Sequence, residues 1–138
     1  MPPLTRWYIK SAIVCFVLAL VLGAAQLVPG REAAPVLGVI GPVYLHLLVV
    51  GWITQMIFGV AYWMFPKQSV ATPRGSDAIA VATFVLLNAG LLLRVLAEPA
   101  QALRPGAPFG AALAIAALAQ WLAGVGFVLN TWPRVKEK

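Results

Sequence analysis

The residue of this chain best suited to chemistry is its single histidine, His46, which lies inside a long apolar run. Ionisable residues are costly within a membrane span and usually face a bundle interior, a partner or a binding site. Arg94 lies within the next apolar run along the chain. An imidazole and a guanidinium at similar depth suit a haem, because histidine binds the iron and arginine pairs with the propionates. The pair therefore predicts b-type haem, with His46 as the metal ligand.

The same two residues also have a structural interpretation. A histidine within a span can hydrogen-bond to a neighbouring helix and hold a bundle together. The side chain of Arg94 can also extend along apolar surface until its guanidinium reaches the interface. Zinc and copper centres usually have three or four ligands, whereas this chain has one His and one Cys, Cys15. We therefore expect no zinc or copper centre within one subunit, and the haem and structural interpretations both stay open.

Four apolar runs must position these residues. The chain has 138 residues, of which 62% are hydrophobic and 10% charged, and its mean hydropathy is +0.90. Runs of roughly 18 or more apolar residues predict membrane-spanning helices. Such runs cover about 7–28, 36–65, 77–97 and 109–132, with Gly and Pro residues in the connections. The sequence thus predicts a single all-α domain, 1–138, that forms an integral membrane four-helix bundle with up-down-up-down topology. The first run is expected to be a retained helix rather than a signal peptide, because its apolar core is long.

The distribution of basic residues predicts the orientation in the membrane. Lys and Arg are enriched in cytoplasmic segments. With four spans, seven of the ten Lys and Arg residues lie on the side of the two termini. Both termini are therefore expected in the cytoplasm, with the protein in a bacterial inner membrane and with His46 and Arg94 near the outer face. The net charge of +6 is explained by this topology, and a nucleic-acid partner is not expected because no soluble domain could carry a basic face.

The second run has a recognisable pattern. The stretch "HLLVVGWITQMIFGVAYWMFP" resembles the second helix of small four-helix membrane proteins related to the catalytic subunit of the haem–copper oxidases. "LLNAGLLLRVL" and "GVGFVLNTWPRVK" resemble the later helices, so that the resemblance covers roughly residues 36–135. It implies a cytochrome b-like haem protein of electron transport. It also adds Tyr44, Trp52 and Asn88 to His46 and Arg94 as candidate cofactor-binding residues.

The resemblance leaves the identity of the axial ligand open. Those proteins carry a His-x-His pair, and this sequence has Tyr44 at the first position of the pair and His46 at the second. Positions 44 and 46 are about 200° apart around a helix, so they cannot both face one haem. Tyrosine also ligates haem iron, although more rarely than histidine. If Tyr44 stands at the ligand position, the chain has kept the fold and lost the cofactor.

A single histidine also limits the activity. Reduction of oxygen or nitric oxide in the large oxidases requires further histidines around a second metal, so we do not expect an enzyme. A homodimer could supply two histidines to a shared haem for electron transfer, and a monomer would leave an open position for a diatomic gas. The alternative function is a cofactor-free accessory subunit of a larger respiratory-type complex. The expected partners are the lipid bilayer and either further copies of the chain or other membrane subunits.

Small and uncharged polar residues within the runs are expected to pack the helices. Gly110 with Ala114, and Ala117 with Trp121, give the fourth run a small face that suits a tight bundle or an oligomer interface. Four amide side chains within spans are expected to bond to neighbouring helices: Gln55, Asn88, Gln120 and Asn130.

Overall fold

The computed structural model describes residues 1–30 and 35–135. Its elements are α1 (Pro3–Ala25), α2 (Pro35–Gly38), α3 (Gly41–His46), η2 (Leu47–Thr54), α4 (Gln55–Met64), α5 (Asp77–Leu103), α6 (Ala107–Thr131) and η3 (Trp132–Arg134). Four helices of the described chain are long and apolar enough to cross a membrane, with α3, η2 and α4 forming the second of them. The predicted helical membrane fold is confirmed.

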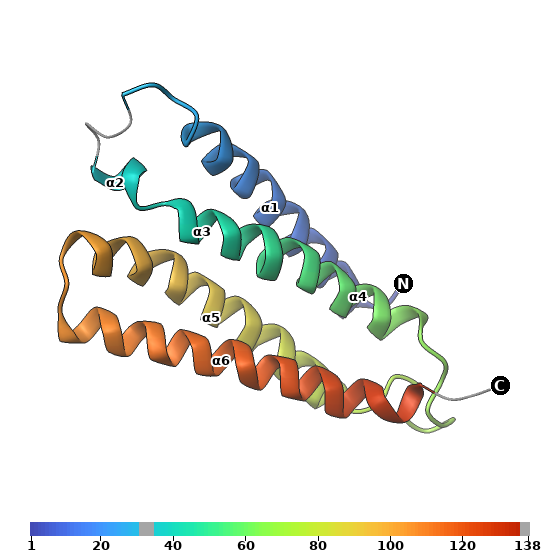
Figure 1. Ribbon diagram of the computed structural model, residues 1–138. Helices are drawn as coiled ribbons and strands as arrows, with labels where there is room; N and C mark the ends of the chain where they lie inside the picture. The colour runs from blue at the N-terminus through green and yellow to red at the C-terminus, as the bar shows by residue number, and fades with distance from the viewer. Residues whose placement is uncertain (31–34, 136–138) are drawn as a thin grey trace.

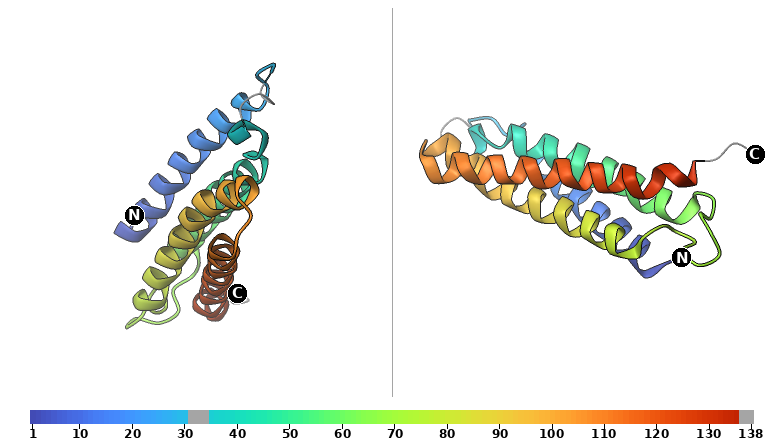
Figure 2. Two further views of the ribbon diagram at one scale, coloured as in Figure 1. Left: turned by 90° about the vertical axis from the view of Figure 1, so that its left-hand side faces the viewer. Right: turned by 90° about the horizontal axis from the view of Figure 1, so that it is seen from below.

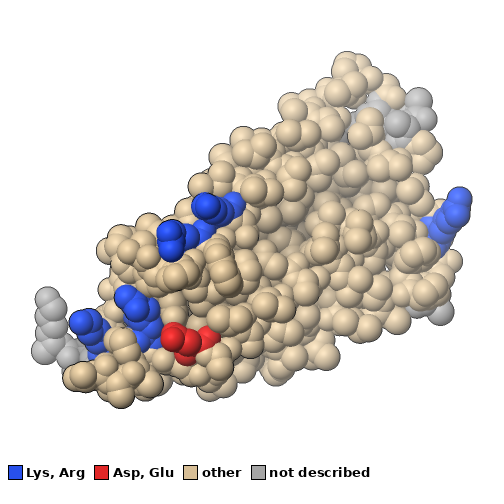
Figure 3. Space-filling view, turned by 180° about the vertical axis from the view of Figure 1, so that it is seen from behind, with Lys and Arg blue, Asp and Glu red and all other residues tan. Residues whose placement is uncertain are grey.

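The four spanning helices run side by side in alternating directions (Figures 1 and 2). The beginning of α1 and the end of α6 lie at the same end of the molecule, which is called the termini end below. The α5–α6 connection lies at the opposite end, called the far end. Figure 3 shows that Lys and Arg gather toward the termini end on the face drawn there. Arg6, Lys10 and Lys67 are exposed, and Arg74 is half-buried.

The second span begins later than the predicted run of 36–65. The short helix α2 ends at Gly38, and the spanning helix starts at Gly41. Pro42 lies in the first turn of this helix, where the missing N–H of proline leaves no backbone hydrogen bond unmade. Directly after His46, the residues of η2 form a π-helix. The wider π turn changes which residues share a face on its two sides, and such turns are frequent at functional sites.

The third span extends beyond its predicted end at residue 97. Helix α5 continues through Pro99 to Leu103. Proline fixes φ near the helical value and removes one hydrogen bond, so a proline near the end of a long helix can be accommodated. The predicted start is confirmed, because the Ser76 hydroxyl accepts a hydrogen bond from the Ile79 N–H at 3.3 Å and caps the helix.

The spans associate as two hairpins. Helix α1 packs along the second span, and α5 packs along α6 over most of its length. Glycines allow both close approaches, because a Cβ at Gly59 would lie 2.6 Å from Cβ of Tyr8 and a Cβ at Gly90 would lie 2.9 Å from the Ala116 carbonyl oxygen. The second span has far fewer contacts with α6 than with α1. Where α4 meets α6, the ring of Phe127 stacks on the ring of Phe58, with centroids 3.9 Å apart and planes 3° from parallel.

The predicted small face of the fourth run is not the face that packs within the chain. Gly110, Ala114, Ala117 and Trp121 are all exposed, whereas Ala116 and Ala123 are fully buried. The rotation of α6 is set by its contact with α5, where Gly90 admits the α6 backbone. The prediction of tight bundle packing through these residues is therefore wrong, and their role in an oligomer stays a prediction.

The amide side chains within the spans behave differently from one another. The Gln55 side-chain amide donates to the Tyr8 carbonyl oxygen of α1 at 3.5 Å, and Oδ1 of Asn130 accepts from the N–H of Ser76, which caps α5, at 2.8 Å. These two predicted contacts between helices are confirmed. Asn88 instead donates to a carbonyl one turn earlier in its own helix at 2.9 Å, so the prediction for it is wrong. Among the described residues the Gln120 amide nitrogen has no hydrogen-bond partner.

Candidate functional site

His46 is the last residue of α3, near the far end of the bundle. Its Nδ1 lies 2.8 Å from the Pro42 carbonyl oxygen, one turn earlier in the same helix. A carbonyl oxygen only accepts, so the proton of a neutral ring must lie on Nδ1. The other ring nitrogen, Nε2, then carries the lone pair that a metal requires. The imidazole side chain is 28% exposed, which leaves part of the ring open to a ligand.

A carboxylate joins His46 to Arg94. Glu98 Oε2 lies 3.5 Å from His46 Nδ1, and Glu98 Oε1 accepts a hydrogen bond from Arg94 Nη1 at 3.3 Å. The side chains of Arg94 and Glu98 are 17% and 16% exposed. The structure thus brings the two predicted residues into one cluster, His46–Glu98–Arg94, which links α3 to α5.

Sequence reasoning missed the role of Glu98. The third span was predicted to end before this residue, which placed the carboxylate at a helix end and outside the bundle. The useful signal was the spacing of four between Arg94 and Glu98, because residues at i and i+4 share a helix face. Continuation of α5 through Pro99 puts the carboxylate on the same face as the arginine.

The cluster has unused hydrogen-bonding capacity. With a neutral imidazole its formal charges cancel, since Arg94 and Glu98 carry one charge of each sign. Within the described part of the chain, Arg94 Nε and Glu98 Oε2 are buried and have no hydrogen-bond partner. Buried polar atoms are nearly always paired in native proteins, so each unpaired atom calls for an explanation. An additional group that accepts a hydrogen bond from Nε of Arg94 would supply one of the missing partners.

The other candidate residues make their contacts elsewhere, either with α1 or within their own helix. Tyr44 packs toward α1, where a Cβ at Gly23 would lie 3.1 Å from the Tyr44 ring. Trp52 also faces α1 and contacts Phe16, with ring centroids 4.0 Å apart. Asn88 bonds within α5. His46 and Arg94 therefore come together, whereas Tyr44 and Trp52 face α1, with which their span forms a hairpin.

A hollow of about 670 Å³ lies beside Tyr44, bounded by α1 residues that include Leu20 and Gly23. Tyr44 and His46 thus point toward different surroundings, as their angular separation on a helix requires. Tyr44 and His46, the two alternative haem ligands, therefore lie at separate places in the fold. A substitution at one of them should not disturb the residues around the other.

A second polar network, which the sequence did not predict, joins the helices at the termini end. Arg134, one of the seven basic residues on the side of the termini, is only 1% exposed. Its guanidinium donates to the carbonyl oxygens of Tyr62, Phe65 and Pro66 at 3.1, 2.8 and 3.1 Å. The Tyr62 hydroxyl donates to Asp77 at 2.6 Å. Arg134 therefore satisfies carbonyls that the end of α4 leaves unpaired and ties the second span to the fourth.

Comparisons of the chain with protein-family models, with curated proteins and with solved structures found no match.

Proposed function

We propose that this chain binds a b-type haem near the far end of the bundle through Nε2 of His46. The observation that carries the proposal is the 2.8 Å hydrogen bond from Nδ1 to the Pro42 carbonyl oxygen. Metal-binding histidines commonly donate their second ring nitrogen to a carbonyl or carboxylate, which sets the tautomer and the ring orientation. His46 has this arrangement, which leaves Nε2 as the ligand nitrogen.

The remaining residues of the cluster fit a haem in part. The unpaired Nε of Arg94 is a donor for a propionate, and charge-assisted hydrogen bonds of this kind are strong. The Glu98 carboxylate, 3.5 Å from Nδ1, is the kind of neighbour that holds the ring of a metal-binding histidine in one orientation. A haem bound here would supply one-electron redox chemistry or a coordination position for a diatomic gas. Electron transfer or gas sensing is therefore the activity we propose.

Electron transfer through a haem with two histidine ligands would need a second contributor, because the chain has one histidine. A homo-oligomer could place one His46 from each copy on a shared haem, and a partner subunit of a larger complex could supply another ligand. We further propose that the termini end is cytoplasmic, since Lys and Arg gather there and are enriched on that side of inner-membrane proteins. The His46–Glu98–Arg94 cluster then lies near the outer face of a bacterial inner membrane.

The alternative function is a cofactor-free accessory subunit, and one observation favours it. Glu98 already pairs with Arg94 at 3.3 Å and lies beside His46, so the cluster can be explained as a polar contact that holds α3 against α5. A paired arginine is also less available to a propionate than a free one. Under this alternative the chain binds no cofactor and contributes packing surface to a larger complex.

The test is the reduced-minus-oxidised absorption spectrum of protein produced with haem supplied. The wild-type chain is compared with His46→Ala and Tyr44→Phe, which change the two alternative ligands on different sides of one helix. We expect an α band near full haem occupancy in the wild type and in Tyr44→Phe, and its loss in His46→Ala. Loss in Tyr44→Phe alone would move the ligand to Tyr44. A flat spectrum from all three folded proteins would refute haem binding and favour the accessory subunit.

A further inference from the structure

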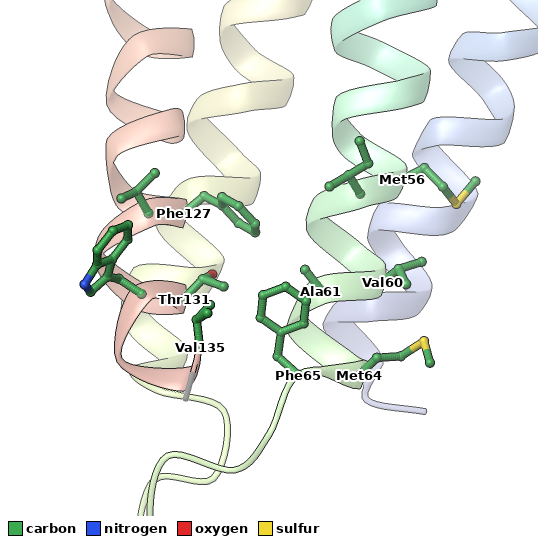
Figure 4. Close-up of a pocket in the computed structure, with 11 residues that line it drawn as sticks. Met56, Val60, Ala61, Met64, Phe65, Phe127, Thr131 and Val135 are labelled. Atoms are coloured by element: carbon green, nitrogen blue, oxygen red, sulfur yellow. The ribbon is translucent and has the colours of Figure 1, made fainter. Parts of the chain in front are cut away.

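A long apolar groove lies between the second and fourth spans at the termini end. The part nearest the termini end is a hollow of about 700 Å³ between α4 and α6, and its lining includes Ala61, Phe65 and Trp132. Figure 4 shows Ala61 and Phe65 on the α4 side of the hollow, with Phe127, Thr131 and Val135 on the opposite side. The groove exists because the two hairpins contact each other only sparsely along these two helices.

The groove continues along α6 toward the far end of the bundle. A second hollow, of about 470 Å³, includes Trp121 and Gly124 in its lining and shares Phe127 and Val128 with the first. From Trp121 to Thr131 the two hollows follow α6 for about 15 Å, at a rise of 1.5 Å per residue, and Val135 also lines the first hollow just beyond the helix. One leaflet of a bilayer has a hydrocarbon thickness of about 15 Å, half of the whole core. The groove therefore matches one leaflet and not the full depth of the membrane.

This length distinguishes the possible occupants. A partner helix that spans the membrane would pack along the whole of α6, so it would need a groove about twice as long. An acyl chain of the leaflet at the termini end needs only the length observed. Trp132 is 76% exposed and lines the part of the groove at the termini end, where tryptophan suits the region of the headgroups.

Positive charge lies beside the end of the groove at the termini end, which is called its mouth below. Phe65 lines the groove, and the exposed Lys67 follows it by two residues. The guanidinium of Arg134 binds the Phe65 and Pro66 carbonyl oxygens. Within the described chain, none of its hydrogen-bond acceptors is a carboxylate, and its Nη1 has no partner. The exposed Lys67 forms no ion pair within the described chain, and a lipid with an anionic headgroup complements its charge.

We propose that the groove between α4 and α6 is a binding site for one anionic phospholipid of the leaflet at the termini end. One acyl chain fills the groove between Phe65 and Trp121, and the phosphate lies near Lys67. The site is independent of the His46–Glu98–Arg94 cluster, which lies toward the far end of the bundle.

The test is native mass spectrometry of the detergent-purified chain, titrated with dioleoyl phosphatidylglycerol and, separately, with dioleoyl phosphatidylcholine. Gly124→Leu and Val128→Trp fill the groove. Gly110→Leu is the matched control for the first, because an added Cβ meets nothing within 4 Å at either glycine and Gly110 does not line the groove. Lys67→Gln removes the charge at the mouth, and Lys10→Gln makes the same change at the same end on α1. Circular dichroism confirms that every variant folds.

We expect the wild-type chain to retain one phosphatidylglycerol in preference to phosphatidylcholine. The groove-filling variants should weaken this binding at least tenfold, and Gly110→Leu should not. Lys67→Gln should weaken phosphatidylglycerol binding about fivefold with little effect on phosphatidylcholine, and Lys10→Gln should have little effect on either. Equal binding of the two lipids, or unchanged binding in Val128→Trp, would overturn the proposal. A wild-type dimer that Val128→Trp converts to monomer would also overturn it, by assigning the groove to a second copy.

Discussion

Gly51 is the point at which the second span meets both of its neighbours, and enlarging it is the sharpest test of the packing. A Cβ at this position would lie 2.8 Å from Cβ of Cys15 in α1 and 2.9 Å from Cδ2 of Leu91 in α5. Carbon atoms pack at about 3.5–4.0 Å. The Leu91 methyl group can move by a change of rotamer, but Cβ of Cys15 is fixed to the backbone. Gly51→Ala must therefore push α1 away from the second span.

The expected loss of stability follows from two opposing terms. Overpacking a well-packed site typically costs about 1–3 kcal/mol. Replacing Gly by Ala within a helix recovers up to about 1 kcal/mol of conformational free energy. The net destabilisation of Gly51→Ala should thus be about 0–2 kcal/mol. Gly110→Ala, where nothing lies within 4 Å of an added Cβ, should retain only the favourable term and be neutral or slightly stabilising.

The assay is equilibrium unfolding in mixed micelles, with the sodium dodecyl sulfate fraction as the denaturant and helicity as the signal. A compensating change, Cys15→Gly, removes both atoms of α1 that the new methyl group would meet. It should destabilise the wild type but restore part of the stability of Gly51→Ala, which is a positive coupling in a double-mutant cycle. If Gly51→Ala is as stable as Gly110→Ala, or if the two changes at 51 and 15 are additive, the inferred contact is incorrect.

Three further substitutions test the polar networks in the same assay. Arg134→Gln should destabilise the chain by about 3 kcal/mol, because it breaks charged hydrogen bonds to the carbonyl oxygens at the end of α4; a change under 1 kcal/mol would contradict this capping role. Tyr62→Phe should cost about 1.5 kcal/mol through its lost hydrogen bond to Asp77, and an equally stable variant would show that this bond contributes nothing net. Glu98→Gln should cost about 2–3 kcal/mol because it leaves the Arg94 charge unpaired, and adding Arg94→Met should recover more than half of that loss. No recovery in the double variant would show that the two side chains do not act as a pair.

The predicted spans agree with the structure where the signal is local. Hydropathy over about 20 residues decides whether a helix can cross a membrane, so four runs in the sequence became four long helices. Ser76 marks the start of α5 because a helix cap depends on the next three residues only. The break before Gly41 was missed because an apolar run does not distinguish a continuous helix from two helices joined at glycines.

The candidate site was foreseen only in part. The pairing of His46 with Arg94 came from their depth in adjacent spans, and the structure brings both to one carboxylate. Glu98 was missed because Pro99 suggests a helix end, whereas α5 continues past it. Trp52 lies within the π-helix η2, and a π turn changes the faces that a regular helical period predicts. The contact of Trp52 with Phe16 therefore could not be read from spacing.

By itself the sequence determined that the chain is a helical membrane protein, which apolar runs these helices occupy and which ionisable side chains must enter the membrane. These properties depend on composition over short windows, because the cost of placing each residue in hydrocarbon is set by its own chemistry. Only the tertiary structure decided that Glu98 lies between His46 and Arg94, that Arg134 is buried against the end of α4 and that an apolar groove stays open beside α6. Those features depend on the rotation and spacing of helices far apart in the chain, which are set by close contacts such as those at Gly51 and Gly90.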